Sequence, residues 1–71
     1  MNNYVKTWQQ LHGVNNVKLA KLVRARGEKC HESMISHYHN GRKNFSPKVG
    51  GAIAEICGLT LGQVLLPTKN V

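Results

Sequence analysis

The residues best suited to chemistry lie together in one stretch, from Cys30 to Asn44. Its first ten residues predict a short helix in which Met34, Ile35 and Tyr38 form an apolar stripe that faces a core. The opposite face carries short or stiff side chains with hydrogen-bonding groups: Glu32, Ser33, Ser36 and His37. An ordinary solvated helix would carry a mixture of Lys and Glu there, so this face is suited to hydrogen bonding with a partner.

Asn40 and Gly41 end this predicted helix, because glycine readily adopts the left-handed conformation that closes a helix. Arg42 and Lys43 follow at once, beside the negative end of the helix dipole. A short helix with a polar face that runs into a basic loop predicts a segment that enters a groove and contacts phosphate.

The chain has 71 residues, which is enough for one domain with a small core and marginal stability. We expect a single domain over residues 1–71, with its folded core at about 3–66 and a loose tail at 67–71. The formal net charge of +7 favours a polyanionic partner. Eight of the ten cationic residues fall between positions 18 and 48: Lys18, Lys21, Arg24, Arg26, Lys29, Arg42, Lys43 and Lys48.

No leader peptide or membrane span is expected, since the first residues lack a basic and an apolar region and no apolar run is long enough. The expected location is therefore the cytoplasm. Cys30 and Cys57 could form at most one bridge, and in a reducing compartment both are expected to be thiols.

Apolar spacing and capping residues predict five short helices and no strand, that is, an all-α bundle. The first is expected at about residues 3–12, with Tyr4, Trp8 and Leu11 as its buried stripe. The second begins at Asn15-Asn16 and ends near Gly27. Its stripe is formed by Val17, Ala20 and Val23, with Leu19 and Leu22 beside it. Its other positions carry cations with no acidic residue before Gly27, so a partner of opposite charge is expected for Lys18, Lys21, Arg24 and Arg26.

After the central helix, Phe45 is expected to pin the basic loop to the body of the protein. Ser46-Pro47 marks a clear helix start, and Gly58 marks the end of that helix. Its core-facing positions are Val49, Ala52, Ile53, Ile56 and Cys57. The pair Gly50-Gly51 inside it predicts the close approach of another helix. Thr60 and Gln63 match a capping box that opens a last short helix with Leu61, Val64 and Leu65.

Four short motifs follow one another in order between about residues 14 and 66. They are Asn16-Val17-Lys18-Leu19-Ala20, Ser33-Met34-Ile35-Ser36, His39-Asn40-Gly41, and Ile53-Ala54-Glu55-Ile56-Cys57-Gly58-Leu59-Thr60-Leu61. Their order resembles the polar-x-x-Leu-Ala, Ser-Thr-Ile-Ser, Glu-Asn-Gly and Ile-Ala-x-x-Leu-Gly-Val-Ser-Leu motifs of the phage repressor and Cro family. The resemblance implies a lambda-repressor-like helix-turn-helix bundle.

Two features depart from the family pattern. The spacing from Leu19 to Ile35 is longer than the family's, so either the second helix is extended or the turn through Arg24 to Cys30 is wider. An alignment that starts from Leu22 reduces this excess but places Leu19 where a polar phosphate contact is expected. His39 replaces the family's Glu, which puts the hydrogen bond or salt bridge of that Glu in question.

The resemblance implies sequence-specific binding of duplex DNA by a small transcriptional regulator, Cro-like or repressor-like, in a bacterial host's cytoplasm or nucleoid. Such proteins normally bind an operator as a homodimer, with the second helix of the motif in the major groove. The implied base-reading residues are His31, Glu32, Ser33, Ser36 and His37. The implied phosphate-binding residues are Asn16, Lys18, Asn40, Arg42, Lys43 and Asn44. No cofactor, metal, membrane or small-molecule substrate is expected.

Several of these residues also have purely structural explanations. Glu32 can complement the helix dipole, His31 can cap the helix, and Ser33 and Ser36 can be plain surface. Because an imidazole near phosphate protonates more readily, the three histidines in or beside this helix, His31, His37 and His39, predict tighter DNA binding near pH 6 than near pH 8.

The sequence leaves three alternatives to DNA binding. A metal site would use Cys30, His31, His37 and His39, but their spacing does not match the paired ligands of structural zinc sites. An enzyme would need more than a cysteine with a histidine nearby, since no orienting acid or oxyanion site is indicated. A protein-interaction module on the same fold, such as an antirepressor or the DNA-binding half of an antitoxin, is the remaining alternative.

Overall fold

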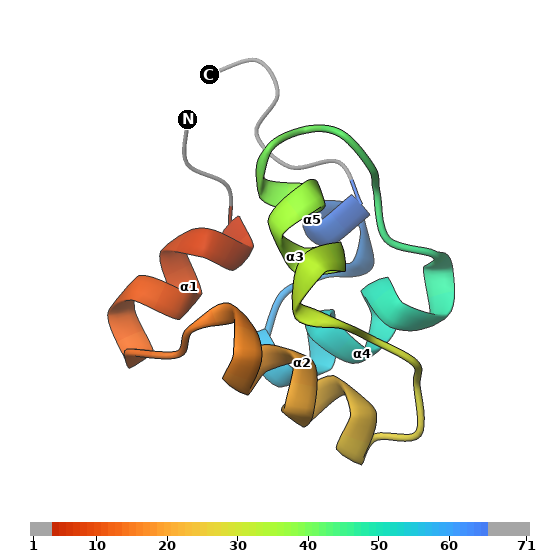
Figure 1. Cartoon of the computed structure of the whole chain (residues 1–71), viewed down its shortest axis with the longest axis horizontal. Coiled ribbons are helices and arrows are strands. Elements are labelled where there is room, and N and C mark those ends of the chain that lie inside the picture. Colours follow the sequence, from red (N-terminus) through yellow and green to blue (C-terminus); the bar gives the residue numbers. More distant parts are fainter. Residues whose placement is uncertain (1–3, 66–71) are drawn as a thin grey trace.

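The computed structural model describes residues 4–65, which form five helices and no strand. The helices are α1 (Tyr4–His12), α2 (Asn16–Ala25), α3 (Glu32–His39), α4 (Pro47–Cys57) and α5 (Leu61–Leu65). The predicted all-α bundle of five short helices is therefore confirmed. Within these residues α3 lies across the middle of the bundle in front of α5, with α1 on one side and α4 on the other (Figure 1). The predicted tail at residues 67–71 lies outside the described part of the chain.

Side chains at the predicted starting positions cap three of the helices. The Asn15 side chain accepts a hydrogen bond from the third backbone N–H beyond it at 2.8 Å, and Ser46 does the same for α4 at 3.4 Å. Pro47 occupies the first position of α4, where a missing N–H has no cost. Thr60 and Gln63 form the predicted capping box, with bonds of 2.9 and 3.1 Å.

The core draws on all five helices and on three connecting segments. Its buried apolar residues are Val5, Val14, Leu19, Ala20, Val23, Cys30, Ile35, Tyr38, Phe45, Val49, Ala52, Ile53, Ala54, Cys57 and Val64. The predicted stripe of α4 is confirmed except for Ile56, which is only partly buried. None of the described helices has both the length and the apolar character that a membrane span requires.

The predicted buried stripe of α1 is wrong. Tyr4 is 44% exposed and Leu11 is 78% exposed, whereas Val5 and Gln9 are buried and Trp8 is partly buried. Val5 and Gln9 are four positions apart and therefore share one helical face. That face packs inward because the polar end of Gln9 finds hydrogen-bond partners inside the protein, which apolar spacing alone does not reveal.

The predicted stripe of α2 is partly wrong. Val17 is 42% exposed, and the buried residues are Leu19, Ala20 and Val23. A helix with apolar residues on more than one face is oriented by the neighbours it packs against, and here these are α3 and α4. Leu22, which is partly buried, packs at the edge of the core.

Gly50 and Gly51 of α4 have different surroundings. A Cβ atom on Gly50 would lie 2.7 Å from the side chain of Leu65, so the predicted close approach is confirmed at this position. At Gly51 nothing lies within 4 Å of such an atom, so the prediction is wrong there. Gly58 ends α4 in the left-handed conformation, with φ +70°, as expected.

Candidate nucleic-acid interface

The segment between α2 and α3 resolves the spacing problem in the sequence. The helix α2 ends at Ala25 and α3 begins at Glu32, so α2 is not extended and the connecting turn, residues 26–31, is wide. The long spacing from Leu19 to Ile35 is therefore explained by the wider turn and not by a longer helix. Gly27 within the turn adopts a left-handed conformation, with φ +91°.

Two arginines of the basic run bind within the protein. The Arg24 guanidinium donates to the carbonyl oxygen of Cys30 at 2.8 Å, across the turn. Arg26 forms an ion pair of 2.6 Å with Glu55 of α4. The expectation of an external partner of opposite charge is therefore wrong for Arg26, whose charge is paired with Glu55. For Arg24 it stays a prediction, because a carbonyl oxygen does not neutralise the guanidinium. Both contacts hold the turn on the bundle. Lys18 and Lys21 are exposed.

The inner face of α3 is firmly seated in the bundle. Ile35 is fully buried and Tyr38 is 4% exposed. The Tyr38 hydroxyl donates to the carbonyl oxygen of Val64 in α5, and its ring stacks on Phe45 with centroids 4.1 Å apart. Burial raises the pKa of Tyr38 to about 12, so the hydroxyl remains a donor at neutral pH. Phe45 thus pins the basic loop as predicted.

The outer face of α3 carries the small polar residues. Ser33 and His37 are four positions apart, as are Glu32 and Ser36, and Ser36 and Asn40, so these five lie on neighbouring rows of one side. Glu32, Ser33 and Asn40 are exposed, whereas Ser36 and His37 are half-buried. The predicted base-reading residues of the helix are therefore brought together, and Asn40, predicted for phosphate, lies in line with them.

His31 caps α3. Its ring Nδ1 accepts a hydrogen bond from the backbone N–H of Ser33 at 3.2 Å. Its own backbone N–H donates to the sulfur of Met34 at 3.4 Å. Met34 was expected in the core but is 37% exposed, and its thioether is used at the start of the helix.

The predicted phosphate-binding residues fall into two groups. Lys18, Asn40, Arg42 and Lys43 are exposed on the surface. The Asn44 amide donates to the carbonyl oxygen of Leu65 at 2.6 Å, and its oxygen accepts from the backbone N–H of Phe45. Asn16 accepts from Gln9. A phosphate contact by Asn44 or Asn16 would use the lone pairs or protons that these bonds leave available.

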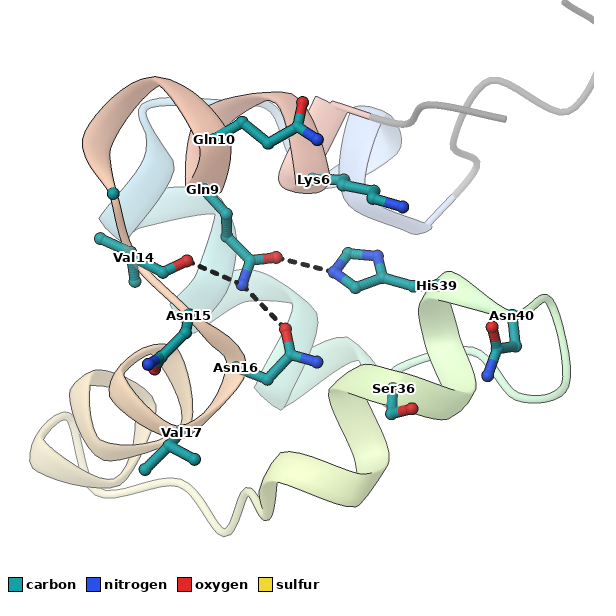
Figure 2. Close-up of a pocket in the computed structure, with 11 residues that line it drawn as sticks. Lys6, Gln9, Gln10, Val14, Asn15, Asn16, Val17, Ser36, His39 and Asn40 are labelled. Carbon is teal, nitrogen blue, oxygen red and sulfur yellow. Dashed lines mark hydrogen bonds between the residues drawn. The ribbon is translucent and has the colours of Figure 1, made fainter.

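An open groove of about 720 Å³ lies between α1, the start of α2 and the end of α3. Polar residues of all three helices line it, and Figure 2 shows Gln9 and His39 pointing toward each other across it. The polar residues are Lys6, Gln9 and Gln10 of α1, Asn15 and Asn16 at the start of α2, and Ser36, His39 and Asn40 around the end of α3. The groove therefore continues the polar face of α3 toward the N-terminus of α2.

Gln9 is the centre of a hydrogen-bond network in this groove. Its Nε2 donates to the carbonyl oxygen of Val14 at 3.2 Å and to Oδ1 of Asn16 at 2.9 Å. Its Oε1 lies 2.7 Å from Nε2 of His39 (Figure 2). Because the amide nitrogen of Gln9 is the donor in both other bonds, its oxygen must accept, and His39 must donate from Nε2.

His39 therefore makes a hydrogen bond at the position where the sequence resemblance put one in question. Burial lowers the pKa of His39, and the positive charge of Lys6 lowers it further. The easier protonation expected of the three histidines concerns their approach to DNA phosphate, so it stays a prediction. Gln9 was not among the predicted site residues, although its place four residues after Val5 on a helical face is a usable signal.

The cysteines and histidines do not form a metal site in the described residues, which contain no group of three or more possible ligands close together. Cys30 and Cys57 are both buried free thiols. Burial raises the pKa of Cys30, opposed by the charge of Arg24, and burial raises that of Cys57 to about 11. A buried thiol with a raised pKa is a poor nucleophile.

Comparisons with protein-family models, with curated proteins and with solved structures find no match to this chain. The resemblance to the phage repressor and Cro family therefore depends on the four sequence motifs alone.

Proposed function

We propose that this protein binds duplex DNA sequence-specifically, with α3 in the major groove, and acts as a small transcriptional regulator. One observation carries the proposal. The inner face of α3 is buried, while its outer face gathers short polar side chains and leads directly into the exposed cations Arg42 and Lys43. Short side chains reach a partner only if the helix itself comes close, and the major groove of B-DNA admits an α-helix.

The outer face of α3 has suitable chemistry for base edges. The carboxylate of Glu32 can accept from the amino group of cytosine, and serine hydroxyls can donate or accept. His37 can donate to guanine or accept from adenine, depending on its tautomer. Each well-formed contact of this kind is worth about 1–3 kcal/mol of discrimination between bases.

The surroundings of α3 supply contacts to the DNA backbone. Arg42 and Lys43 flank one end of α3, and Lys18 is exposed in the first turn of α2. The amide-lined groove between α1, α2 and α3 can accommodate a sugar-phosphate strand beside the major groove. Each phosphate neutralised by a cation adds about −0.9 to the slope of log affinity against log salt concentration.

We further propose that two copies bind one operator. A single short recognition helix reads only a few base pairs, and helix-turn-helix proteins commonly bind two half-sites about one helical turn apart as dimers. The operator would then be palindromic, with its symmetry matching the two-fold axis of the dimer.

Selection of bound sequences from a pool of random duplexes tests the proposal. We expect a palindromic consensus, binding to random duplex that weakens steeply with salt, and markedly tighter binding to the consensus. A protein-interaction module that uses the same fold on an acidic protein, such as an antirepressor, would yield no consensus. Failure to enrich any sequence under conditions where the protein is folded would overturn the proposal.

A further inference from the structure

We propose that Gln9, a residue of α1, is the positioning residue that sets the placement of α3 for base reading. The inference rests on the proposed function. Gln9 is 6% exposed, and its amide bonds to both α2 and α3. Among the described residues, Gln9 therefore joins α1 both to the start of α2 and to the end of α3 through its hydrogen bonds (Figure 2).

The wide turn between α2 and α3 makes such a tie necessary. A short turn restricts the angle between two helices, whereas residues 26–31 leave that angle to contacts elsewhere. The hydrophobic contribution of Ile35 is non-directional and does not by itself specify the orientation of α3. Hydrogen bonds require defined distances and angles, so they select one placement.

Three polar contacts fix α3 and its lead-in segment. Arg24 holds the carbonyl of Cys30 before the helix, and Tyr38 binds Val64 of α5 behind it. The His39–Gln9 bond joins α3 to α1, and the bond from Gln9 to Asn16 joins both to the start of α2. Loss of Gln9 would thus remove the bond between α1 and the C-terminal end of α3. Ser36 and Asn40, which line the groove at that end, would then be less precisely placed.

Base contacts and phosphate contacts respond differently to such a release. The side chains of Ser33 and Ser36 are short and cannot follow a displaced base edge. Arg42 and Lys43 are long and flexible, and phosphates are contacted without regard to sequence. The loss of positioning should therefore reduce specific binding while leaving binding to random duplex nearly unchanged.

The test measures dissociation constants for the selected consensus and for random duplex, at a temperature where each variant is folded. For Gln9→Met we expect consensus binding to weaken about tenfold, the effect of one lost base contact, with less than about a twofold change on random duplex. His39→Leu should give the same loss. His39→Gln should rescue binding, because a glutamine amide can also donate to the oxygen of Gln9.

Two controls separate positioning from general destabilisation. Ile53→Val shortens a fully buried side chain of α4 and lowers stability without changing the hydrogen bonds of Gln9. The ratio of the affinity for the consensus to that for random duplex should therefore not change. The double variant Gln9→Met/His39→Leu should lose no more specificity than Gln9→Met alone, because Gln9→Met already breaks the bond to His39 together with those to Val14 and Asn16.

Two other results are also informative. If the wild-type protein selects a consensus but Gln9→Met keeps its ratio of affinities, or if His39→Gln fails to rescue, the positioning role of Gln9 is overturned. If the wild-type protein selects no consensus, the proposed function itself fails, and this is distinguishable from the first result.

Discussion

Gly50 of α4 lies directly against Leu65 of α5, since a Cβ atom on Gly50 would be 2.7 Å from Cδ2 of Leu65. Gly51, the next residue of the same helix, faces open space. Alanine favours a helix over glycine by about 0.5–1 kcal/mol. We therefore expect Gly51→Ala to raise the free energy of unfolding by that amount.

Gly50→Ala gains the same helix propensity but must displace the Leu65 side chain, so we expect no net gain or a loss. Urea unfolding of both variants beside the wild-type protein measures the difference. Equal stabilisation by the two substitutions would show that α5 moves aside freely.

The wide turn gives a second prediction. Arg24→Ala removes the hydrogen bond to the carbonyl of Cys30, and we expect the free energy of unfolding to fall by about 1 kcal/mol. Lys21→Ala is the matched control, because it removes one exposed cation from the same helix without this bond. Thermal unfolding at neutral pH measures both. If both variants lose the same free energy of unfolding, removal of a positive charge from α2 accounts for the loss, and the bond across the turn does not.

His39 gives a prediction for pH. Its pKa is lowered in the folded protein, so the folded state binds this proton less readily than the unfolded state does. Stability is then complete above the ordinary histidine pKa of 6.5 and falls as the pH drops below it. Since glutamine does not titrate, His39→Gln should lose less stability than the wild-type protein between pH 7.5 and pH 5. Urea unfolding at both pH values tests this, and equal losses would contradict it.

DNA binding itself gives a paired prediction for the two classes of contact. Lys43→Ala should weaken binding to consensus and random duplex alike and reduce the salt slope by about one. His37→Ala should weaken consensus binding and relax the preference at one base position, with the salt slope nearly unchanged. Fluorescence anisotropy across a salt series distinguishes the two patterns. Identical behaviour of both variants would argue against α3 as the reading helix.

The sequence predicted the helices well because their ends depend on local chemistry. Each capping residue contacts backbone groups only a few positions away in the sequence. The predicted roles are confirmed for Ser46 with Pro47, for Gly58, and for the pair Thr60 and Gln63. The outward face of α3 was predicted for the same reason, since the apolar residues Ile35 and Tyr38 leave only one side for the polar residues.

The errors concern contacts between distant parts of the chain. Tyr4 and Leu11 have helical spacing, yet Val5 and Gln9 face the core, because the partners of the Gln9 amide lie on α2 and α3. Arg26 was assigned to an external anion because its partner, Glu55, is 29 residues away. Hydrogen bonds of this kind depend on the assembled bundle, so periodicity within one helix cannot reveal them.

The two native thiols also provide a means of observing motion. Cys30 closes the wide turn and Cys57 ends α4, and both are buried with raised pKa values. A thiol-labelling reagent can react with either only when the protein opens around it. The labelling rate of Cys30 therefore reports how often the turn before α3 opens, and the labelling rate of Cys57 reports how often the bundle opens around α4.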